Sequence, residues 1–209
     1  MKKIVLYSDQ IKEDRKLDYE LLRLLNKKNP SIAYLRGASD LTGKYFNYVV
    51  DYYGDLGITN INYFDLDREY DKVKISHIFN YDAIHLSGGN TFRFLNLLRE
   101  TNVLNPLKSY VESGKVLIGV SAGSIITTKS IDTAKFLDED IVGLNDRSSL
   151  GVVDFDFIPH WNNNQSEEKL KLLRTYSNLK NRTIYACKDG NGIVIEGEDI
   201  KFIGDIIKV

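Results

Sequence analysis

Short apolar runs alternate along the chain with longer stretches in which apolar residues recur every three or four positions. The short runs have the length of buried strands and predict β-strands at residues 3–7, 32–35, 58–64, 83–86, 116–120, 152–158, 182–187, 192–195 and 200–209. The longer stretches predict helices at residues 17–28, 44–56, 72–80, 91–99, 103–113, 122–128 and 166–179. The polar segment 132–150 predicts a loop.

The order of these elements indicates the fold class. Strands that alternate with helices predict a mainly parallel sheet with helices on both faces, which is a three-layer α/β sandwich. The run 116–120 is continuously apolar, as is typical of a strand covered on both sides. Gly197-Glu198-Asp199 separates the last two strands and predicts an antiparallel hairpin at one edge of the sheet. Neither a repeat nor a linker interrupts the pattern, so we expect a single α/β domain over residues 1–209.

Composition narrows the class of protein. The 209 residues are 43% hydrophobic and 27% charged, an ordinary globular balance that can form a core without a metal or a disulfide. A net charge of -1 gives no general attraction to nucleic acid or an anionic membrane. Cys187 is the single cysteine, which suits a reducing compartment. With no long apolar stretch and a first apolar run too short for a secretory signal, we expect a cytoplasmic monomer or dimer.

The most informative motif is Gly119-Val120-Ser121-Ala122-Gly123, between a predicted strand and a predicted helix. A serine at such a sharp turn projects from the sheet in strained backbone geometry, as a nucleophile does. The glycines two residues to either side leave room where a Cβ would collide across the turn. The alternative is a tight turn with a capping serine. The strand before and the helix after favour Ser121 as a nucleophile.

A second glycine-rich turn, Gly88-Gly89-Asn90-Thr91, also joins a strand to a helix. A backbone N–H from this turn and the N–H of Ala122 could together form an oxyanion hole. The turn could instead be a simple one in which Asn90 or Thr91 caps the helix. It is a poor candidate for a phosphate-binding loop, because it contains neither the G-x-G-x-x-G motif nor the Gly-Lys-Ser/Thr motif.

A serine nucleophile needs a base, and histidine is the usual base at neutral pH. Of the three histidines, His160 directly follows a predicted strand, at the edge where sites of parallel sheets form. His85 lies within a strand, and His77 lies in a weak helix. We therefore expect His160 to be the base, although a loop histidine can also be structural.

The base needs an acid that orients it, and several carboxylates compete for this role. Asp189 lies just past a predicted strand, where an ordered element would hold it in place. The alternatives lie in the polar loop after the nucleophile: Asp138, Glu139 and Asp140. We favour Asp189, with Asp138 as the alternative acid. Cys187 falls in an apolar strand and is interpreted as a small buried hydrophobic residue rather than a nucleophile.

Four segments resemble the serine peptidase family that includes aspartyl dipeptidase (dipeptidase E) and cyanophycinase. They are Leu86-Ser87-Gly88-Gly89-Asn90-Thr91-Phe92, Gly119-Val120-Ser121-Ala122-Gly123-Ser124, Ile158-Pro159-His160 and Lys188-Asp189-Gly190-Asn191. Their order and spacing also match. The resemblance implies a flavodoxin-like sheet related to class I glutamine amidotransferases. It further implies Ser121 as nucleophile, His160 as base, and the N–H groups of Gly89 and Ala122 as oxyanion donors.

The resemblance implies a serine-type peptidase that hydrolyses short peptides through an acyl-enzyme, with no cofactor or metal. The chain departs from the family in two places. Asp189 stands where the family usually has glutamate, and the stretch after the histidine segment lacks the arginine of the dipeptidase branch. A preference for aspartyl substrates therefore does not follow. Two alternatives are a serine hydrolase or acyl transferase that acts on a non-peptide substrate, and an inactive binding protein of the same fold.

Overall fold

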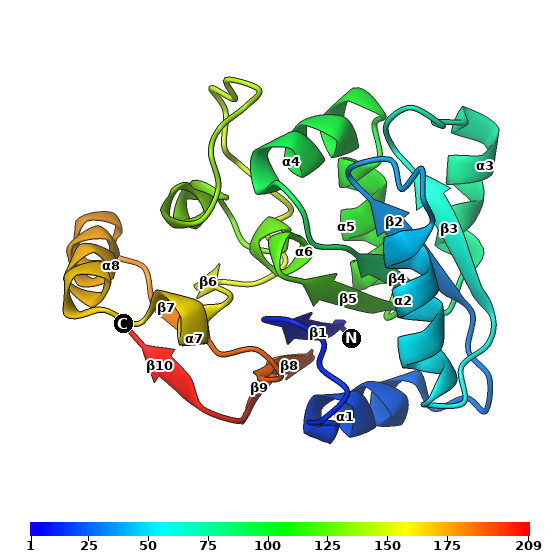
Figure 1. Cartoon of the computed structure of the whole chain (residues 1–209), viewed down its shortest axis with the longest axis horizontal. Helices are drawn as coiled ribbons and strands as arrows, with labels where there is room; N and C mark the ends of the chain where they lie inside the picture. The colour runs from blue at the N-terminus through cyan, green and yellow to red at the C-terminus, as the bar shows by residue number, and fades with distance from the viewer.

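The computed structural model describes the backbone of residues 1–209 and every side chain except that of Asn164. A seven-stranded sheet forms its centre (Figure 1). In spatial order its strands are β3 (Ile61–Asp65), β2 (Ile32–Arg36), β4 (Ala83–Leu86), β5 (Val116–Val120), β1 (Lys3–Tyr7), β8 (Gly192–Glu196) and β9 (Asp199–Ile203). The first five are parallel, and the last two add antiparallel pairs at one edge. The expected mainly parallel sheet with antiparallel C-terminal strands is confirmed.

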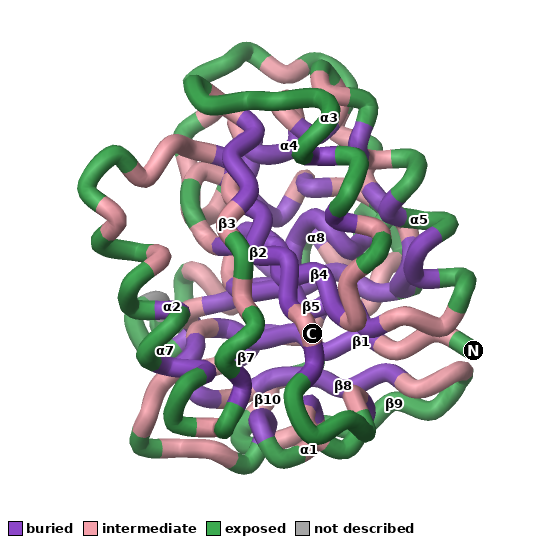
Figure 2. Tube along the Cα trace, turned by 90° about the vertical axis from the view of Figure 1, so that its right-hand side faces the viewer, coloured by how far each residue is buried: buried purple, intermediate pink, exposed green. Residues whose placement is uncertain are grey.

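Helices cover both faces of this sheet and give three layers. On one face α1 (Lys16–Leu25) and α2 (Lys44–Gly54) pack on strand residues such as Val5 and Ile118. The helices on the other face are α3 (Lys72–Ser76), α4 (Thr91–Glu100), α5 (Leu104–Glu112) and α6 (Ala122–Ile126). They pack on the alternate strand residues, such as Ile4 and Leu117. The central strands are buried on both sides for this reason (Figure 2).

A second, three-stranded sheet lies beside the first, and the pattern of residues does not predict it. Its order is β10 (Ile206–Lys208), β7 (Ile184–Cys187) and β6 (Asp156–Ile158), with β6 and β7 parallel. Helix α8 (Glu167–Lys180) packs against it with the short helix α7 (Trp161–Asn164) (Figure 1). Ser166 caps the N-terminus of α8, because its side chain accepts a hydrogen bond from the Lys169 N–H.

Several predicted boundaries are wrong. The strand predicted at 200–209 is two strands in different sheets, because the chain turns at Gly204, which has a φ of 87°. The strand predicted at 152–158 is only Asp156–Ile158. The helix predicted at 72–80 becomes a 3-10 turn at His77–Asn80, and the predicted loop 132–150 contains another at Asp132–Phe136. Among the described residues, no helix combines the length and the apolar character needed to cross a bilayer.

Candidate active site

The site lies where the parallel strands of the large sheet end. The strand order places β4, β5 and β1 side by side, so the loops that follow them meet at one edge. These loops begin with Ser87, Ser121 and Ser8, respectively. Backbone hydrogen bonds join them, because the Ser121 N–H donates to the Tyr7 carbonyl and the Gly123 N–H donates to the Ser87 carbonyl. Hydrogen bonds among the loops at the carboxyl ends of β4, β5 and β1 therefore fix the position of Ser121.

The turn at Ser121 has the geometry that its sequence predicts. Ser121 has a φ of 52° and a ψ of -110°, a strained conformation that costs about 1–3 kcal/mol for a residue with a side chain. A Cβ on Gly123 would lie 2.1 Å from the Leu86 carbonyl oxygen. A Cβ on Gly119 would lie 2.8 Å from the backbone of Ser124. Both positions thus require glycine for steric reasons, and the turn holds the hydroxyl clear of the sheet.

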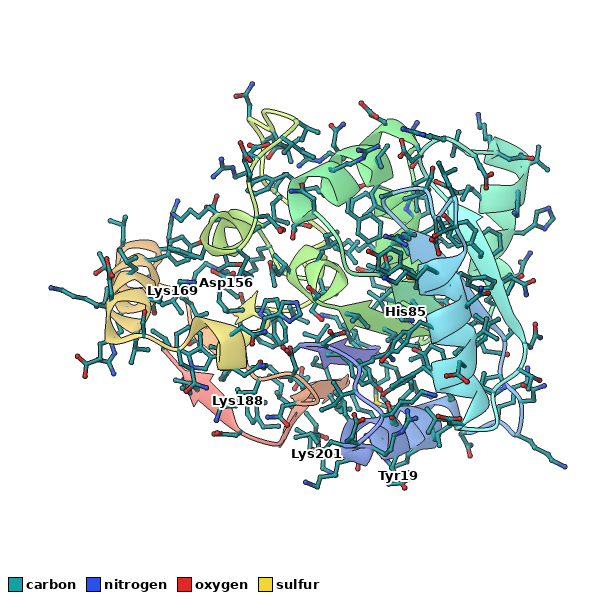
Figure 3. All side chains as sticks on the ribbon, viewed as in Figure 1. Tyr19, His85, Asp156, Lys169, Lys188 and Lys201 are labelled. Atoms are coloured by element: carbon teal, nitrogen blue, oxygen red, sulfur yellow. The ribbon has the colours of Figure 1, made fainter. Side chains whose placement is uncertain are left out.

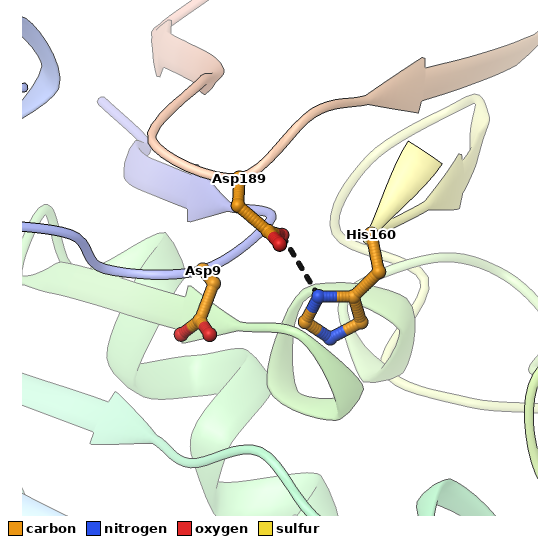
Figure 4. Close-up of side chains that lie close together, drawn as sticks. All are labelled: Asp9, His160 and Asp189. Atoms are coloured by element: carbon orange, nitrogen blue, oxygen red, sulfur yellow. Dashed lines mark hydrogen bonds and ion pairs between the residues drawn. The ribbon is translucent and has the colours of Figure 1, made fainter. Parts of the chain in front are cut away.

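The second sheet brings an imidazole and a carboxylate to this hydroxyl. Because β6 and β7 are neighbouring parallel strands, the residues that follow them lie close together. His160 follows β6 and Asp189 follows β7. The Ser121 Oγ lies 2.8 Å from the His160 Nε2. The His160 Nδ1 in turn lies 2.8 Å from the Asp189 Oδ1, as Figure 4 shows by a dashed line. Ser121, His160 and Asp189, the three residues predicted from the sequence, are therefore connected by a continuous chain of two hydrogen bonds.

Ser8 links these groups, although the sequence pattern did not predict this role. The fully buried Ser8 hydroxyl donates to the Asp189 Oδ1 at 2.8 Å and accepts from the His160 N–H at 2.7 Å. The Asp189 N–H in turn donates to the Asn162 side chain at 3.0 Å. Burial favours a higher pKa for Asp189, but hydrogen bonds from His160, Ser8 and Asn162 outweigh it and lower that pKa. The available signal was a polar run, Ser8-Asp9-Gln10, directly after a buried strand.

The electrostatics of the site favour the protonated imidazole. The hydrogen bond to Asp189 raises the pKa of His160 above its ordinary value of 6.5. Burial opposes this shift, while the negative charges of Asp189, Asp9 and Asp138 add to it. With Nδ1 facing Asp189, neutral His160 carries its proton on Nδ1, and Nε2 is left as an acceptor for the serine proton.

The predicted oxyanion donors lie at the same place. Gly89 lines the hollows around Ser121, and its φ of 126° is a conformation that suits glycine. Ala122 is the first residue of α6, where backbone N–H groups have no partner within the helix. Among the described residues, neither N–H has a protein acceptor. Asn90 caps α4 by accepting from the Arg93 N–H, so this turn also fits the simpler structural interpretation.

The alternative acid, Asp138, lies nearby but has a different partner. Its carboxylate accepts hydrogen bonds from the Thr91 N–H at 2.9 Å and from the Thr91 hydroxyl at 2.6 Å. The next residue of the loop is Glu139, and its backbone carbonyl accepts a hydrogen bond from the Asn90 side chain. Asp138 therefore anchors the loop to the start of α4, whereas Asp189 holds the imidazole of His160.

Among the described residues, neither of the other two histidines nor the cysteine forms a hydrogen bond with the Ser121 hydroxyl. His85 is buried within β4, where burial lowers its pKa to about 3, and its Nδ1 lies 3.1 Å from the Tyr53 hydroxyl (Figure 3). His77 lies in a 3-10 turn on the exterior. Cys187 is buried, and burial raises the pKa of its thiol, as expected of an unreactive core cysteine.

Two hollows meet at Ser121, and both are also lined by Gly89 and His160. The first, of about 530 Å³, extends past Asp9 to Arg36 and Lys44. The second, of about 480 Å³, extends past Thr91 and Asp138 to Lys169 on α8. A peptide lying across the serine could place one side of its scissile bond in each hollow.

Arg36 gives the first hollow an unusual positive group. Its guanidinium stacks on the Tyr45 ring at 3.9 Å, and the nearest carboxylate oxygen, of Asp40, lies 3.7 Å from Nη1. Its Nε and Nη1 atoms are buried with no hydrogen-bond partner among the described residues. Because Arg36 lines the first hollow, its positive charge favours a negatively charged substrate group there.

Three potential metal ligands also lie together. Single ligand atoms of Asp9, His160 and Asp189 are all within 4.8 Å of one another (Figure 4). The same imidazole and carboxylate form the His160–Asp189 hydrogen bond, so a metal ion bound through the Nδ1 atom would displace its proton. The cluster is therefore better explained as part of a proton-transfer site.

Known proteins share this fold. The chain resembles the crystal structure of a candidate peptidase E from Listeria monocytogenes EGD-e with a TM-score of 0.79, at 24% identity and over 97% of this chain and 98% of that one. It resembles a peptidase from an acI-B1 actinobacterium with a TM-score of 0.71, at 15% identity and over 98% and 88% of the two chains. At these identities the likeness concerns the fold alone.

Curated relatives match over shorter segments. An uncharacterized peptidase of Pasteurella multocida (strain Pm70) is 36% identical over 99 residues, which are 46% of this chain and 48% of that protein. A peptidase E of Nostoc sp. (strain PCC 7120) is 31% identical over 153 residues, 68% and 62% of the two. The matched part thus spans about half to three-fifths of these relatives. The model of peptidase family S51, in contrast, matches residues 4–203, and the chain belongs to that family.

Proposed function

We propose that this protein is a serine peptidase that hydrolyses short peptides through an acyl-enzyme. The observation that supports this most directly is the continuous hydrogen-bonded line from the Ser121 hydroxyl through His160 to Asp189, with both distances at 2.8 Å. Family membership supports the same chemistry. The order along the chain is serine, histidine, acid, which differs from that of α/β-hydrolases and argues against a lipase or esterase.

In the first step, His160 Nε2 takes the Ser121 proton as Oγ attacks the peptide carbonyl carbon. The carbonyl oxygen gains negative charge, which the N–H groups of Gly89 and Ala122 stabilise. Asp189 keeps the imidazole oriented and stabilises its positive charge once it is protonated.

In the second step, His160 gives its proton to the departing amine, and the C–N bond breaks. Water then enters, loses a proton to His160 and attacks the acyl-enzyme ester, which releases the acid and restores the Ser121 hydroxyl. Every proton in this scheme passes through Nε2, so no metal or cofactor is required by it.

A dipeptide library, with wild type and Ser121→Ala assayed in parallel, tests this proposal. Peptides with acidic side chains belong in it, because Arg36 and Lys44 line the first hollow. We expect Ser121→Ala to reduce kcat/KM by at least about 10³-fold. Ser124→Ala is the matched control, since it removes a neighbouring serine hydroxyl that donates only to the Tyr7 carbonyl. Equal hydrolysis by wild type and Ser121→Ala would indicate a contaminating peptidase and end the proposal.

Labelling with a fluorophosphonate distinguishes the alternatives. Labelled Ser121 without peptide hydrolysis would indicate a serine hydrolase or acyl transferase with a non-peptide substrate. No labelling and no hydrolysis would indicate a binding protein of the same fold. We also propose that the protein works in the cytoplasm, because its single cysteine, Cys187, is buried and unpaired.

A further inference from the structure

Three buried polar side chains from distant segments form a hydrogen-bonded series beside the first hollow, and the proposed mechanism uses none of them. The Gln10 Nε2 donates to the Tyr53 hydroxyl at 3.1 Å, and that hydroxyl lies 3.1 Å from the His85 Nδ1. Gln10 belongs to the turn after β1, Tyr53 to α2 and His85 to β4 (Figure 3). All three side chains are buried, so a bond lost from the series would leave polar atoms without a partner.

The chemistry of the three groups determines the direction of each bond in the series. The Tyr53 hydroxyl has one hydrogen and, among the described residues, two partners, Gln10 and His85. Because the Gln10 amide nitrogen can only donate, the hydroxyl hydrogen is directed to the His85 Nδ1, which accepts it as part of a neutral imidazole. Burial lowers the pKa of His85 to about 3 and raises the pKa of Tyr53. Neither group therefore changes its protonation near neutral pH, and the series stays intact there.

The series anchors the turn that carries Ser8. The backbone carbonyl of Gln10 also accepts from the Tyr48 hydroxyl at 2.9 Å, so both the side chain and the backbone of Gln10 are bonded to tyrosines of α2. Two residues earlier, the Ser8 hydroxyl donates to Asp189 and accepts from the His160 N–H. A displacement of Gln10 would move Ser8 relative to both partners. Hydrogen bonds depend steeply on distance and angle, so a shift of about 1 Å would weaken them.

We propose that Tyr53 is a positioning residue of the site. Through the amide of Gln10 it holds the turn after β1, and this keeps the Ser8 hydroxyl in contact with His160 and Asp189. In the part of the chain that the structure describes, Tyr53 is not among the residues that line the two hollows, so a substrate in them would not touch it. The expected effect on hydrolysis rests on the proposed peptidase function, whereas the expected effect on the imidazole of His160 does not.

Steady-state kinetics of Tyr53→Phe, with melting temperatures to check folding, test the effect on hydrolysis. We expect kcat to fall by about tenfold and KM to stay within about twofold, because Asp189 is held less firmly while the hollows keep their lining. Tyr52→Phe is the matched control, since it removes a neighbouring buried hydroxyl that donates to Asp18 at 2.7 Å. It should keep kcat within about twofold.

A double variant shows whether Tyr53 acts through Ser8. In a Ser8→Ala background, Tyr53→Phe should lower kcat by less than about twofold, because the contact through which it acts is already lost. A full tenfold loss in that background (about tenfold, as in the single variant) overturns the proposal. Equal losses of kcat in Tyr52→Phe and Tyr53→Phe overturn it as well.

An NMR titration of the His160 imidazole tests the proposal without any substrate. The hydrogen bond to Asp189 is the main cause of the raised pKa of His160, and the negative charges of Asp189, Asp9 and Asp138 add to it, while burial opposes it. A weaker bond to Asp189 stabilises the imidazolium less and therefore lowers the pKa of His160.

We expect Tyr53→Phe to lower the pKa of His160 by at least about half a unit and Tyr52→Phe to leave it unchanged. Gln10→Met removes the same amide donor and replaces Tyr53→Phe if the latter does not fold. A lowered pKa in a protein that hydrolyses no peptide supports the positioning role and counts against the peptidase proposal. An unchanged pKa of His160 in Tyr53→Phe overturns the positioning role and leaves the peptidase proposal standing.

Discussion

The two sheets of this protein contribute different parts of the proposed site. The seven-stranded sheet provides Ser121 and the glycine turn at Gly89, on loops anchored to buried central strands. The small sheet provides His160 and Asp189 from strands of three and four residues. The serine hydroxyl is thus fixed by one layer of the fold, and the groups that would activate it are fixed by another. The site exists only where the two sheets meet.

The segment between β7 and β8 joins the sheets at that point. Residues 188–191 run from the small sheet into the large one. They are held to the end of β1, because the Gly190 N–H donates to the Asp9 carbonyl and the Ser8 N–H donates to the Asn191 carbonyl, each at 3.0 Å. Asp189 lies within this segment. Its position therefore depends on contacts with both sheets.

The largest effect on kcat/KM is expected when the two candidate acids, Asp189 and Asp138, are compared. Asp189→Asn should reduce kcat/KM by about 10³–10⁴-fold, because a neutral amide neither stabilises the imidazolium nor secures the tautomer with the proton on Nδ1. Asp138→Asn should reduce it by less than about tenfold, since Asp138 binds Thr91 rather than the imidazole. Steady-state kinetics on both variants, with melting temperatures to check folding, provide the comparison. A larger loss for Asp138→Asn would reverse the assignment of the acid.

A smaller effect is expected when the link between the sheets is weakened. Ser8→Ala removes the hydroxyl that donates to Asp189 and accepts from the His160 N–H. We expect kcat/KM to fall by about tenfold, mostly through kcat, because both partners stay in place but are held less firmly. Ser124→Ala is again the control, because it removes a buried hydroxyl at the same end of β1, bonded at 2.7 Å to the Tyr7 carbonyl. An equal loss in the two variants would show that Ser8 acts only through general packing.

The smallest expected effect concerns pH. The base must be neutral, so kcat/KM should fall as the pH drops through the raised pKa of His160, with a midpoint above 6.5. Removing a nearby negative charge destabilises the imidazolium and moves this midpoint to lower pH. Asp138→Asn should therefore shift it downward by less than about one unit. The pH profiles of kcat/KM for wild type and Asp138→Asn measure the shift. A midpoint that moves to higher pH in Asp138→Asn would show that the Asp138 carboxylate does not stabilise the imidazolium.

The sequence alone predicted much of the fold and the main groups of the site. Local periodicity indicated nearly all the strands and helices, and the alternation of elements indicated the parallel sheet. The glycines around Ser121 marked the turn in the sequence, and the clash that requires Gly119 is local, whereas the clash that requires Gly123 involves Leu86 on the neighbouring strand β4. His160 was identifiable for a similar reason, since it follows a strand directly.

Other features depended on contacts between distant segments. The small sheet, the division of residues 200–209 into β9 and β10, and the hydrogen bonds of Ser8 carry no local signal that distinguishes them from ordinary strands and turns. The choice between Asp189 and Asp138 is of the same kind, because both are loop aspartates in the sequence. Only the pairing of β6 with β7 places Asp189 beside the imidazole. Periodicity specifies where elements form, whereas strand pairing across the chain decides which side chains meet.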